Sequence, residues 1–388
     1  MKCAVDFASY FARVRGGASA SPLIVRSPSE MQSVRAGMDL FSASLAAPAP
    51  ARVSFVPTMG ALHAGHLGLV ERARVDADFV VASVFVNPTQ FAPHEDLAQY
   101  PRTWDADYAA LSRAHVDVVY APTAAAMYPP RAPFRTFVSP AHADETTPEG
   151  GARPGFFRGV ATVVTKLLGA VRPTVAVFGQ KDGVQCIVVR ALVRDLNVPT
   201  VVRVAPTARE TDGLAMSSRN AYLSAAQRAR AGVIFRALER ARTELDASGE
   251  VTGARAAAAE KSLYVGRGVD DDTAAGLAAQ RAAFAANDVP ASRGHTAPPS
   301  PLLARVADAV RAEILAEPTF STVDYVTFSD ALTGGPVTSL RDSTARGGAI
   351  LLSVAARTGS TRLLDNIVLV GDVSDLGAAP GEADEPVK

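Results

Sequence analysis

Short apolar runs alternate with amphipathic segments over the first 207 residues of the chain. Runs typical of buried parallel strands, which lack a polar face, lie at 53–56, 79–86, 116–120, 174–178 and 200–204. Segments with the helical period of apolar residues lie at 28–45, 66–75, 104–114, 159–171 and 184–195. Strands that alternate with helices predict an α/β fold, with a Rossmann-like parallel sheet over residues 23–207.

The pattern changes after residue 207, where one long helix is predicted over 224–247 with Ser224 as its N-cap. A helix near 302–315 follows. Two or three strands are then predicted within 323–328, 349–355 and 363–370. These elements predict a smaller α+β domain over 208–370, which serves as a C-terminal lid.

Three further segments are predicted to be disordered: an N-terminal extension (1–22), an insertion (248–305) and an acidic tail (371–388). The insertion is rich in Ala, Gly, Asp and Pro, and it is either a passive loop or a partner-binding element. The extension is rich in Ala, Ser and Arg, a composition that organelle transit peptides share. A ragged terminus explains it as well, and we expect a cytoplasmic protein.

Composition and charge argue against several classes of protein. The 388 residues carry 39 basic and 39 acidic side chains, so no sequence-wide basic field favours nucleic acid. The two cysteines, Cys3 and Cys186, are far apart, which argues against a disulfide scaffold or a cysteine zinc site. The longest apolar run, 79–86, is too short to cross a membrane. Only five basic residues are lysines, so a lysine within a motif indicates a need for a compact ammonium group.

The first candidate site is the segment PTMGALHAGH (57–66), between a predicted strand and a predicted helix. Gly60 allows a tight turn, and His63 and His66 share one face of the first helical turn. Free N–H groups and the positive end of the helix dipole favour phosphate there, and imidazoles can donate to phosphate oxygens. Taken alone, the two histidines also fit an ordinary turn, or a metal site that lacks a third ligand.

Three more polar segments follow predicted strands or precede the long helix. FVNPTQF offers uncharged amides, Asn87 and Gln90, that suit hydroxyls and a carboxylate; FGQKDGVQ offers Lys181, and AMSSRN offers a phosphate clamp around Arg219. Each also fits a plain capping turn. Four acidic residues either face magnesium through water or form a solvated helix start: Glu95, Asp96, Asp105 and Asp107.

Together PTMGALHAGH, FVNPTQF, ARPGFFRGV, FGQKDGVQ and DGLAMSSRN resemble, in order and spacing, the pantothenate synthetase (pantoate–β-alanine ligase) family of HxGH nucleotidyltransferases. The resemblance runs over about 25–245 and resumes over about 320–370, ending in TRLLDN. It implies a two-step reaction. Pantoate and MgATP give an enzyme-bound pantoyl adenylate and pyrophosphate, and β-alanine then attacks the acyl carbon to release pantothenate and AMP.

The resemblance also implies roles for particular residues. The catalytic groups that it implies are His63, His66, Lys181, Ser217 and Arg219. It implies ATP binding by these groups and by Pro57, Thr58, Met59, Gly60, Gly179, Asp182, Met216 and Ser218. It implies pantoate binding by Asn87, Gln90 and Gln185, and Asp107 matches an acidic position linked to Mg2+. Relatives are commonly homodimers, so a homodimer is expected.

The chain departs from the family's usual pattern at a few positions. The family usually has Glu at Gln180, an aromatic residue and Gln at Gly183 and Val184, and often His at Phe156. Ala106 replaces a residue that is often acidic, so Mg2+ is expected to arrive with ATP. Two alternatives stay open: a different HxGH adenylyltransferase that acts on a phosphorylated substrate, and a non-catalytic nucleotide-binding module.

Overall fold

The structure is a computed structural model that describes residues 21–45, 50–75, 77–93, 95–130, 134–140, 147–249, 251, 299–331, 334–340 and 349–371. Most of the predicted extension, insertion and tail lies outside the described residues, so those three predictions stay predictions. Within the described residues no helix is long and apolar enough to cross a membrane.

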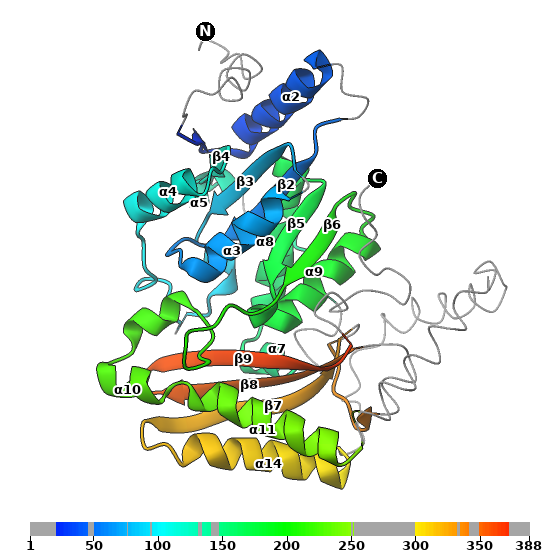
Figure 1. Ribbon diagram of the computed structural model, residues 1–388. Helices are drawn as coiled ribbons and strands as arrows, with labels where there is room; N and C mark the ends of the chain where they lie inside the picture. Colours follow the sequence, from blue (N-terminus) through cyan, green and yellow to red (C-terminus); the bar gives the residue numbers. More distant parts are fainter. Residues whose placement is uncertain are drawn as a thin grey trace, which may run out of the picture.

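Six parallel strands form the larger sheet, in the order β1-β4-β3-β2-β5-β6 (Figure 1). The strands are β1 (Leu23–Val25), β2 (Val53–Thr58), β3 (Phe79–Val84), β4 (Val118–Tyr120), β5 (Val175–Gly179) and β6 (Val201–Ala205). Five of them lie where the apolar runs predicted strands. Strand β1 was not predicted, because three residues at the edge of a sheet give too short an apolar run to recognise.

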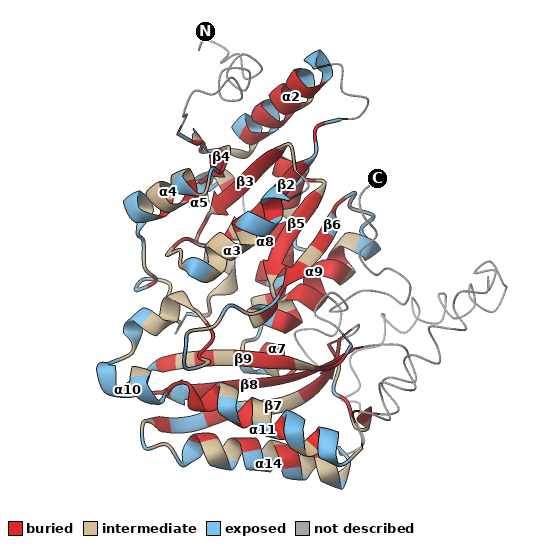
Figure 2. Cartoon of the chain, viewed as in Figure 1, coloured by how far each residue is buried: buried red, intermediate tan, exposed pale blue. Residues whose placement is uncertain are grey.

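Helices cover both faces of this sheet. They are α2 (Pro28–Ser44), α3 (Ala64–Arg74), α4 (Trp104–Arg113), α8 (Phe156–Val171) and α9 (Gly183–Asp195). Phe55 of β2 packs in the core under α2, α8 and α9, whereas the next residue, Val56, packs under α3 and α4. Alternate side chains are thus buried on opposite faces, which is why the strands read as continuous apolar runs (Figure 2).

A second, antiparallel sheet of three strands lies below the first in Figure 1. Its strands are β7 (Phe320–Asp330), β8 (Ile350–Thr358) and β9 (Thr361–Val370), with β8 in the centre. Helices α11 (Val233–Ala247) and α14 (Pro301–Leu315) pack against each other and enclose a separate apolar core with this sheet. The fold class is therefore the predicted one, a Rossmann-like α/β sheet with a smaller α+β part.

The single long helix predicted over 224–247 is wrong, because two helices occupy this segment. Helix α10 (Ala225–Arg230), capped by Ser224 as predicted, ends just before Gly232, and α11 begins after it. A Cβ at Gly232 would lie 2.7 Å from the backbone oxygen of Asp212. The close approach of that turn interrupts the helix, and the helical period of the sequence carries no sign of it.

The order of the strands places a crevice at one edge of the larger sheet. From β2 the chain proceeds to β3 and β4 on one side, and β5 pairs with β2 on the other side. Open parallel sheets bind ligands outside the carboxyl ends of the strands at such a switch point. Short elements that border this edge or join the two sheets are η1 (Pro88–Gln90), η2 (Gln180–Asp182), η3 (Ser218–Tyr222), α5 (Ala124–Met127) and α7 (Pro148–Ala152).

Candidate active site

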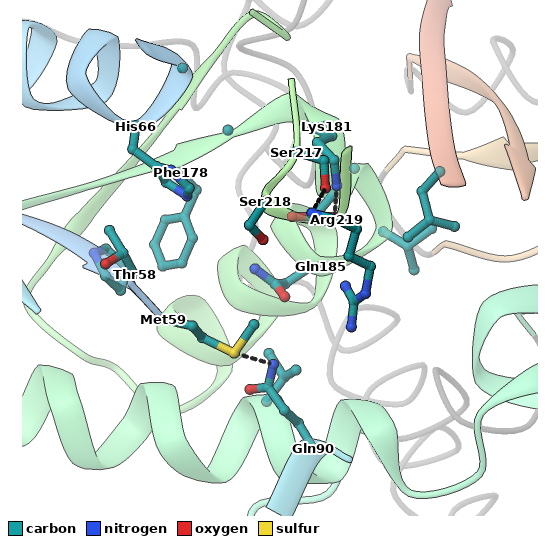
Figure 3. Close-up of a pocket in the computed structure, with 18 of the residues that line it drawn as sticks. Thr58, Met59, His66, Gln90, Phe178, Lys181, Gln185, Ser217, Ser218 and Arg219 are labelled. Atoms are coloured by element: carbon teal, nitrogen blue, oxygen red, sulfur yellow. Dashed lines mark hydrogen bonds and ion pairs between the residues drawn. The ribbon is translucent and has the colours of Figure 1, made fainter. Parts of the chain in front are cut away.

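A cavity of about 240 Å³ lies at the switch point, between the carboxyl edge of the larger sheet and strands β7, β8 and β9. Its wall brings together most residues that the sequence predicted: Pro57, Thr58, Met59, His63, His66, Asn87, Gln90, Gly179, Lys181, Asp182, Gln185, Met216, Ser217, Ser218 and Arg219. Two predicted residues, Gly60 and Asp107, are not part of this wall. Figure 3 shows Lys181, Ser217 and Arg219 grouped on one side of the cavity, with Met59 and Gln90 opposite them.

The two histidines lie side by side at the start of α3. His63 is the N-cap residue and His66 is in the first turn, so their rings are in contact, with centroids 4.0 Å apart and planes tilted by 39°. The backbone N–H of His63 donates to Nδ1 of His66 at 3.3 Å. Because this bond uses Nδ1 as an acceptor, the proton of a neutral His66 resides on Nε2, which is thus available as a donor.

Burial keeps both imidazoles neutral near pH 7. Burial, together with the charge of Lys181, lowers the pKa of His63 to about 4. Burial, with His63 and Lys181 nearby, lowers the pKa of His66 to about 3. Within the described structure, Nδ1 of His63 is buried without a hydrogen-bond partner. The site thus contains a buried ring nitrogen, Nδ1 of His63, that the protein leaves without a partner. An anionic ligand would also offset the positive charge of Lys181 beside the two rings.

We expect the folded protein to lose stability as the pH falls below about 6.5, the usual pKa of histidine. The unfolded chain takes up protons on both histidines there, whereas the folded protein resists them until about pH 4 and 3. Thermal unfolding from neutral pH down to about pH 5 measures this loss. The double variant His63→Gln/His66→Gln is the control, and an equal loss in that variant would contradict the assignment.

Asp107 holds the glycine turn in place. It is buried, and its carboxylate accepts hydrogen bonds from the backbone N–H groups of Ala61 (2.9 Å) and Leu62 (2.8 Å). Gly60 and Ala61 have positive φ angles of +83° and +50°. A Cβ at Gly60 would lie only 3.0 Å from Asp107 Oδ2, so a glycine is needed there. Both carboxylate oxygens of Asp107 are therefore engaged by the turn, and a contact of Asp107 with Mg2+ stays a prediction.

The described residues contain no group of three or more His, Cys, Asp or Glu side chains arranged to hold a metal ion. The acidic residues near the site have other partners: Glu95 pairs with Arg153 at 2.6 Å, and Asp96 pairs with Arg219 at 2.9 Å.

Asn87 holds the side chain of Gln90 through a hydrogen bond. Its amide nitrogen donates to Gln90 Oε1 (3.1 Å) and to the carbonyl of Gly159 (3.2 Å), and its oxygen accepts from the Tyr128 hydroxyl (2.9 Å). Gln90 consequently turns its Nε2 toward Met59 Sδ, 3.1 Å away, and the cavity (Figure 3). The protein already uses the polar atoms of the buried Asn87, which hold the Gln90 side chain in place; direct contact of Asn87 with pantoate stays a prediction.

Lys181 and Gln185 approach the cavity from the end of β5 and the first turn of α9. The ammonium of Lys181 lies 3.1 Å from Asp182 Oδ1. Burial alone would raise the pKa of Asp182, but Lys181, together with the charge of Arg219, holds that pKa below its usual value. The side chain of Gln185 points toward the middle of the cavity (Figure 3). A cation and an uncharged amide thus reach the same space from adjacent turns.

The segment 217–219 closes another side of the cavity. Ser217 caps η3 by accepting a hydrogen bond from the Arg219 backbone N–H (3.3 Å). The Ser218 hydroxyl lies 3.2 Å from the hydroxyl of Tyr100. The loop is therefore anchored to residues far away in the sequence, while the Arg219 side chain still lines the cavity.

The second sheet contributes residues to the cavity that were not predicted from the sequence. Asp365 and Asn366 of β9 line the cavity, and Asn366 Nδ2 donates to the backbone carbonyls of Gln180 (3.0 Å) and Lys181 (2.8 Å). Asp365 forms a two-bond ion pair with Arg209, at 2.6 and 2.9 Å. The available signal was a polar pair inside an otherwise apolar strand, because a buried polar residue in such a strand needs specific partners.

The departures from the family pattern have matching surroundings. Gln180 is buried, and its amide donates to Asn366 Oδ1 (3.2 Å) and accepts from the Thr207 backbone N–H (3.3 Å). A Cβ at Gly183 would lie 2.7 Å from a methyl group of Leu351, which occupies the space of a larger side chain. These uncharged or small residues are therefore accommodated by β8 and β9.

Comparison with known proteins identifies the family. The sequence profile described as "Pantoate-beta-alanine ligase" matches residues 24–368. The chain belongs to the pantoate–β-alanine ligase family. Ligation of pantoate and β-alanine is the activity of this family, and the chain is a ligase of this kind.

Individual relatives agree with this family assignment. The pantothenate synthetase of Herpetosiphon aurantiacus is 41% identical over 323 residues, which are 82% of this chain and 94% of the relative. That of Chloroflexus aggregans is 57% identical over 201 residues, 52% of this chain and 71% of the relative. The crystal structure of the Thermus thermophilus enzyme superimposes with a TM-score of 0.65 at 35% identity, over 90% of this chain and 100% of that chain.

Proposed function

We propose that this ligase condenses pantoate with β-alanine through an enzyme-bound pantoyl adenylate, with ATP as the source of AMP. One observation carries the proposal: imidazoles, an ammonium group and a guanidinium group converge on a single cavity that also presents uncharged amides. The positively charged and ring N–H groups suit a triphosphate, and the amides suit a hydroxy acid.

The chemistry explains why both kinds of group are needed. A carboxylate is a poor electrophile because it is anionic and would have to expel oxide. Attack of the pantoate carboxylate on the α-phosphorus of ATP forms a new O–P bond and expels pyrophosphate. The β-alanine amine then attacks the acyl carbon of the mixed anhydride, and AMP leaves with the bonding electrons. The amine loses one proton to solvent or to a nearby base.

The residues divide between the two substrates in this proposal. Phosphate oxygens are bound by His63, His66, Lys181, Ser217 and Arg219, which stabilise the charge that develops during transfer. The rest of the nucleotide contacts Pro57, Thr58, Met59, Gly60, Gly179, Asp182, Met216 and Ser218. Pantoate is held by Gln90 and Gln185, with Asn87 orienting Gln90. Mg2+ enters as part of MgATP, which agrees with the engagement of Asp107 by the turn.

Alignment of the reacting groups is the main contribution of the protein. Positioning a carboxylate in line with the α-phosphorus removes much of the entropic cost of a bimolecular step. Gln90 lies across the cavity from Lys181, and Gln185 lies between them (Figure 3), so a hydroxy acid held by the two amides has its carboxylate near the phosphates.

Isotope exchange tests the adenylate step directly. We expect labelled pyrophosphate to enter ATP when pantoate and Mg2+ are present, and β-alanine to be unnecessary, because the first step is reversible on the enzyme. No exchange under any condition would contradict the proposal. Exchange that depends on a phosphorylated acceptor and not on pantoate would instead favour another HxGH adenylyltransferase.

Binding can be measured apart from turnover. The solved ligase of Francisella tularensis, which shares the fold at 24% identity and a TM-score of 0.59, is described as complexed with Beta-gamma ATP and Beta-alanine. An ATP analogue and β-alanine are therefore suitable calorimetric probes for this chain. Binding without any turnover would favour a nucleotide-binding module. We also propose a homodimer, and light scattering that gives the mass of one chain would contradict it.

A further inference from the structure

Arg219 is held by a partner far away in the sequence. Its Nε donates to Asp96 Oδ2 (3.1 Å) and its Nη2 to Asp96 Oδ1 (2.9 Å), so the two planar groups face each other across two bonds. The side chains are only 25% and 23% exposed. Two parallel charge-assisted bonds fix the plane of a guanidinium group as well as its position.

Two further contacts bind the same two segments together. The hydroxyl of Tyr100 lies 3.2 Å from that of Ser218, and the hydroxyl of Tyr222 donates to the backbone carbonyl of Gln99 at 3.2 Å. The segment that contains Asp96 is thereby fastened to η3 at three points. Asp96 is consequently a fixed anchor for the guanidinium group, since its own backbone is held beside the cavity.

The ion pair leaves one edge of Arg219 available. Nε and Nη2 are used by Asp96, whereas Nη1 has no hydrogen-bond partner among the described residues. Figure 3 shows the guanidinium group extended toward the middle of the cavity, on the same side as Lys181. Three N–H donors of Arg219 remain, two on Nη1 and one on Nη2, and a phosphate oxygen can accept from them without displacing the carboxylate.

We propose that Asp96 is a positioning residue that aims the free edge of Arg219 at the phosphates of ATP. The inference rests on the proposed function, which places Arg219 on those phosphates. A pre-aimed guanidinium group loses less conformational entropy when ATP binds and when charge develops in transfer. Asp96 therefore stays paired throughout the reaction, and it does not give up Arg219 to the nucleotide.

The variant Asp96→Asn tests the proposal in the full-length protein. It keeps the shape of the side chain and removes the charge and one acceptor. We expect kcat/KM for ATP, measured by pantoate-dependent exchange, to fall by on the order of 10-fold to 100-fold. The KM for pantoate should stay within about twofold, because Gln90 and Gln185 do not contact Asp96.

Matched variants separate positioning from general effects. Glu71→Gln removes one exposed negative charge from α3 and should leave kcat/KM for ATP unchanged. In a protein that already carries Arg219→Lys, adding Asp96→Asn should change kcat/KM for ATP little, because an ammonium group has no plane for the carboxylate to fix. Should Asp96→Asn fail to fold, Asp96→Glu, which shifts the carboxylate by one methylene, should weaken the same parameter.

Three outcomes would overturn the inference. Tighter ATP binding by Asp96→Asn would mean that Asp96 competes with phosphate. Unchanged ATP kinetics, or equal changes for ATP and pantoate, would mean that the pair serves folding alone. Calorimetry with ATP separates this failure from failure of the proposed function. A wild-type protein that binds ATP but shows no exchange contradicts the proposed function, and the Kd values for ATP of the wild type and of Asp96→Asn still test the role of Asp96. A wild-type protein that binds no ATP contradicts both proposals.

Discussion

Lys181→Ala is expected to slow pantoate-dependent pyrophosphate exchange by on the order of 100-fold or more. Lys181 supplies an ammonium group at the end of β5, where it lines the cavity beside Asp182. Charge accumulates on the phosphate oxygens as pyrophosphate departs, and a fixed cation in a sheltered site stabilises that charge more than it stabilises the ground state. Single-turnover formation of pyrophosphate from ATP and pantoate measures the adenylation step apart from product release.

Two control variants sharpen this prediction. Lys181→Arg keeps the charge but replaces a compact ammonium with a planar fork, so a partial recovery of rate is expected. Lys166→Ala removes another of the few lysines, one that lies over Tyr128 and Phe134 away from the cavity wall, and should leave the exchange rate close to normal. Near-normal exchange by Lys181→Ala, with wild-type thermal stability, would remove Lys181 from the catalytic groups.

His66→Ala is expected to slow pantoate-dependent pyrophosphate exchange by a similar factor, because His66 is proposed to donate to the phosphate oxygens on which charge develops. His66 also accepts the backbone N–H of His63, so the alanine variant loses a helix cap as well as a phosphate donor. His66→Asn separates the two effects, since the amide oxygen can take over the cap but supplies no imidazole. If His66→Asn restores the rate along with the stability, the role of His66 is structural.

Gly159→Ala is expected to raise the KM for pantoate by about tenfold or more and to destabilise the protein by about 2 kcal/mol. A Cβ at Gly159 would lie 2.3 Å from the backbone oxygen of Thr89 and 2.9 Å from Cα of Gln90. The backbone of α8 and that of η1 therefore touch, and one of them must move to admit a methyl group. Movement of η1 displaces Gln90, the residue proposed to hold pantoate.

The same helix provides the matched control for this substitution. Gly169 is exposed, and a Cβ there would meet nothing within 4 Å. Gly169→Ala should thus stabilise α8 by about 0.5–1 kcal/mol and leave both substrates unaffected. Steady-state kinetics and thermal unfolding of the two variants check the prediction. An unchanged KM for pantoate in Gly159→Ala would mean that η1 yields without moving Gln90.

Much of the larger sheet was predictable from local pattern. The run at 79–86 is apolar at every position except Ser83, because helices cover both faces of β3. It coincides with the strand to within two residues. The break in 224–247 was not predictable, since it depends on the approach of the Asp212 turn to Gly232. A helical period reports which side of a segment is buried, and it does not report what packs against a single glycine.

The candidate site divides in the same way. The segments at 57–66 and 178–185 follow strands directly, so their neighbourhood follows from the parallel order of the sheet. The residue type of Asn87 suits a hydroxy acid, and the family resemblance assigned Asn87 to pantoate and Asp107 to Mg2+. The structure gives their polar atoms to Gln90 and to the Ala61 and Leu62 amides. Residue type indicates what a side chain can bind, and only its neighbours determine whether that capacity is free.

The sequence by itself determined the two-part architecture, the four polar segments at the edge of the larger sheet and the family to which they are similar. These follow from periodicity and from short motifs, which are properties of neighbouring residues along the chain. The tertiary structure alone decided that Asp96 holds Arg219 across 123 positions and that Asn366 supports the Lys181 turn across 185. Such pairings form only when separate elements pack against each other. Their stability therefore depends on the tertiary packing of the whole fold and cannot be inferred from any one segment.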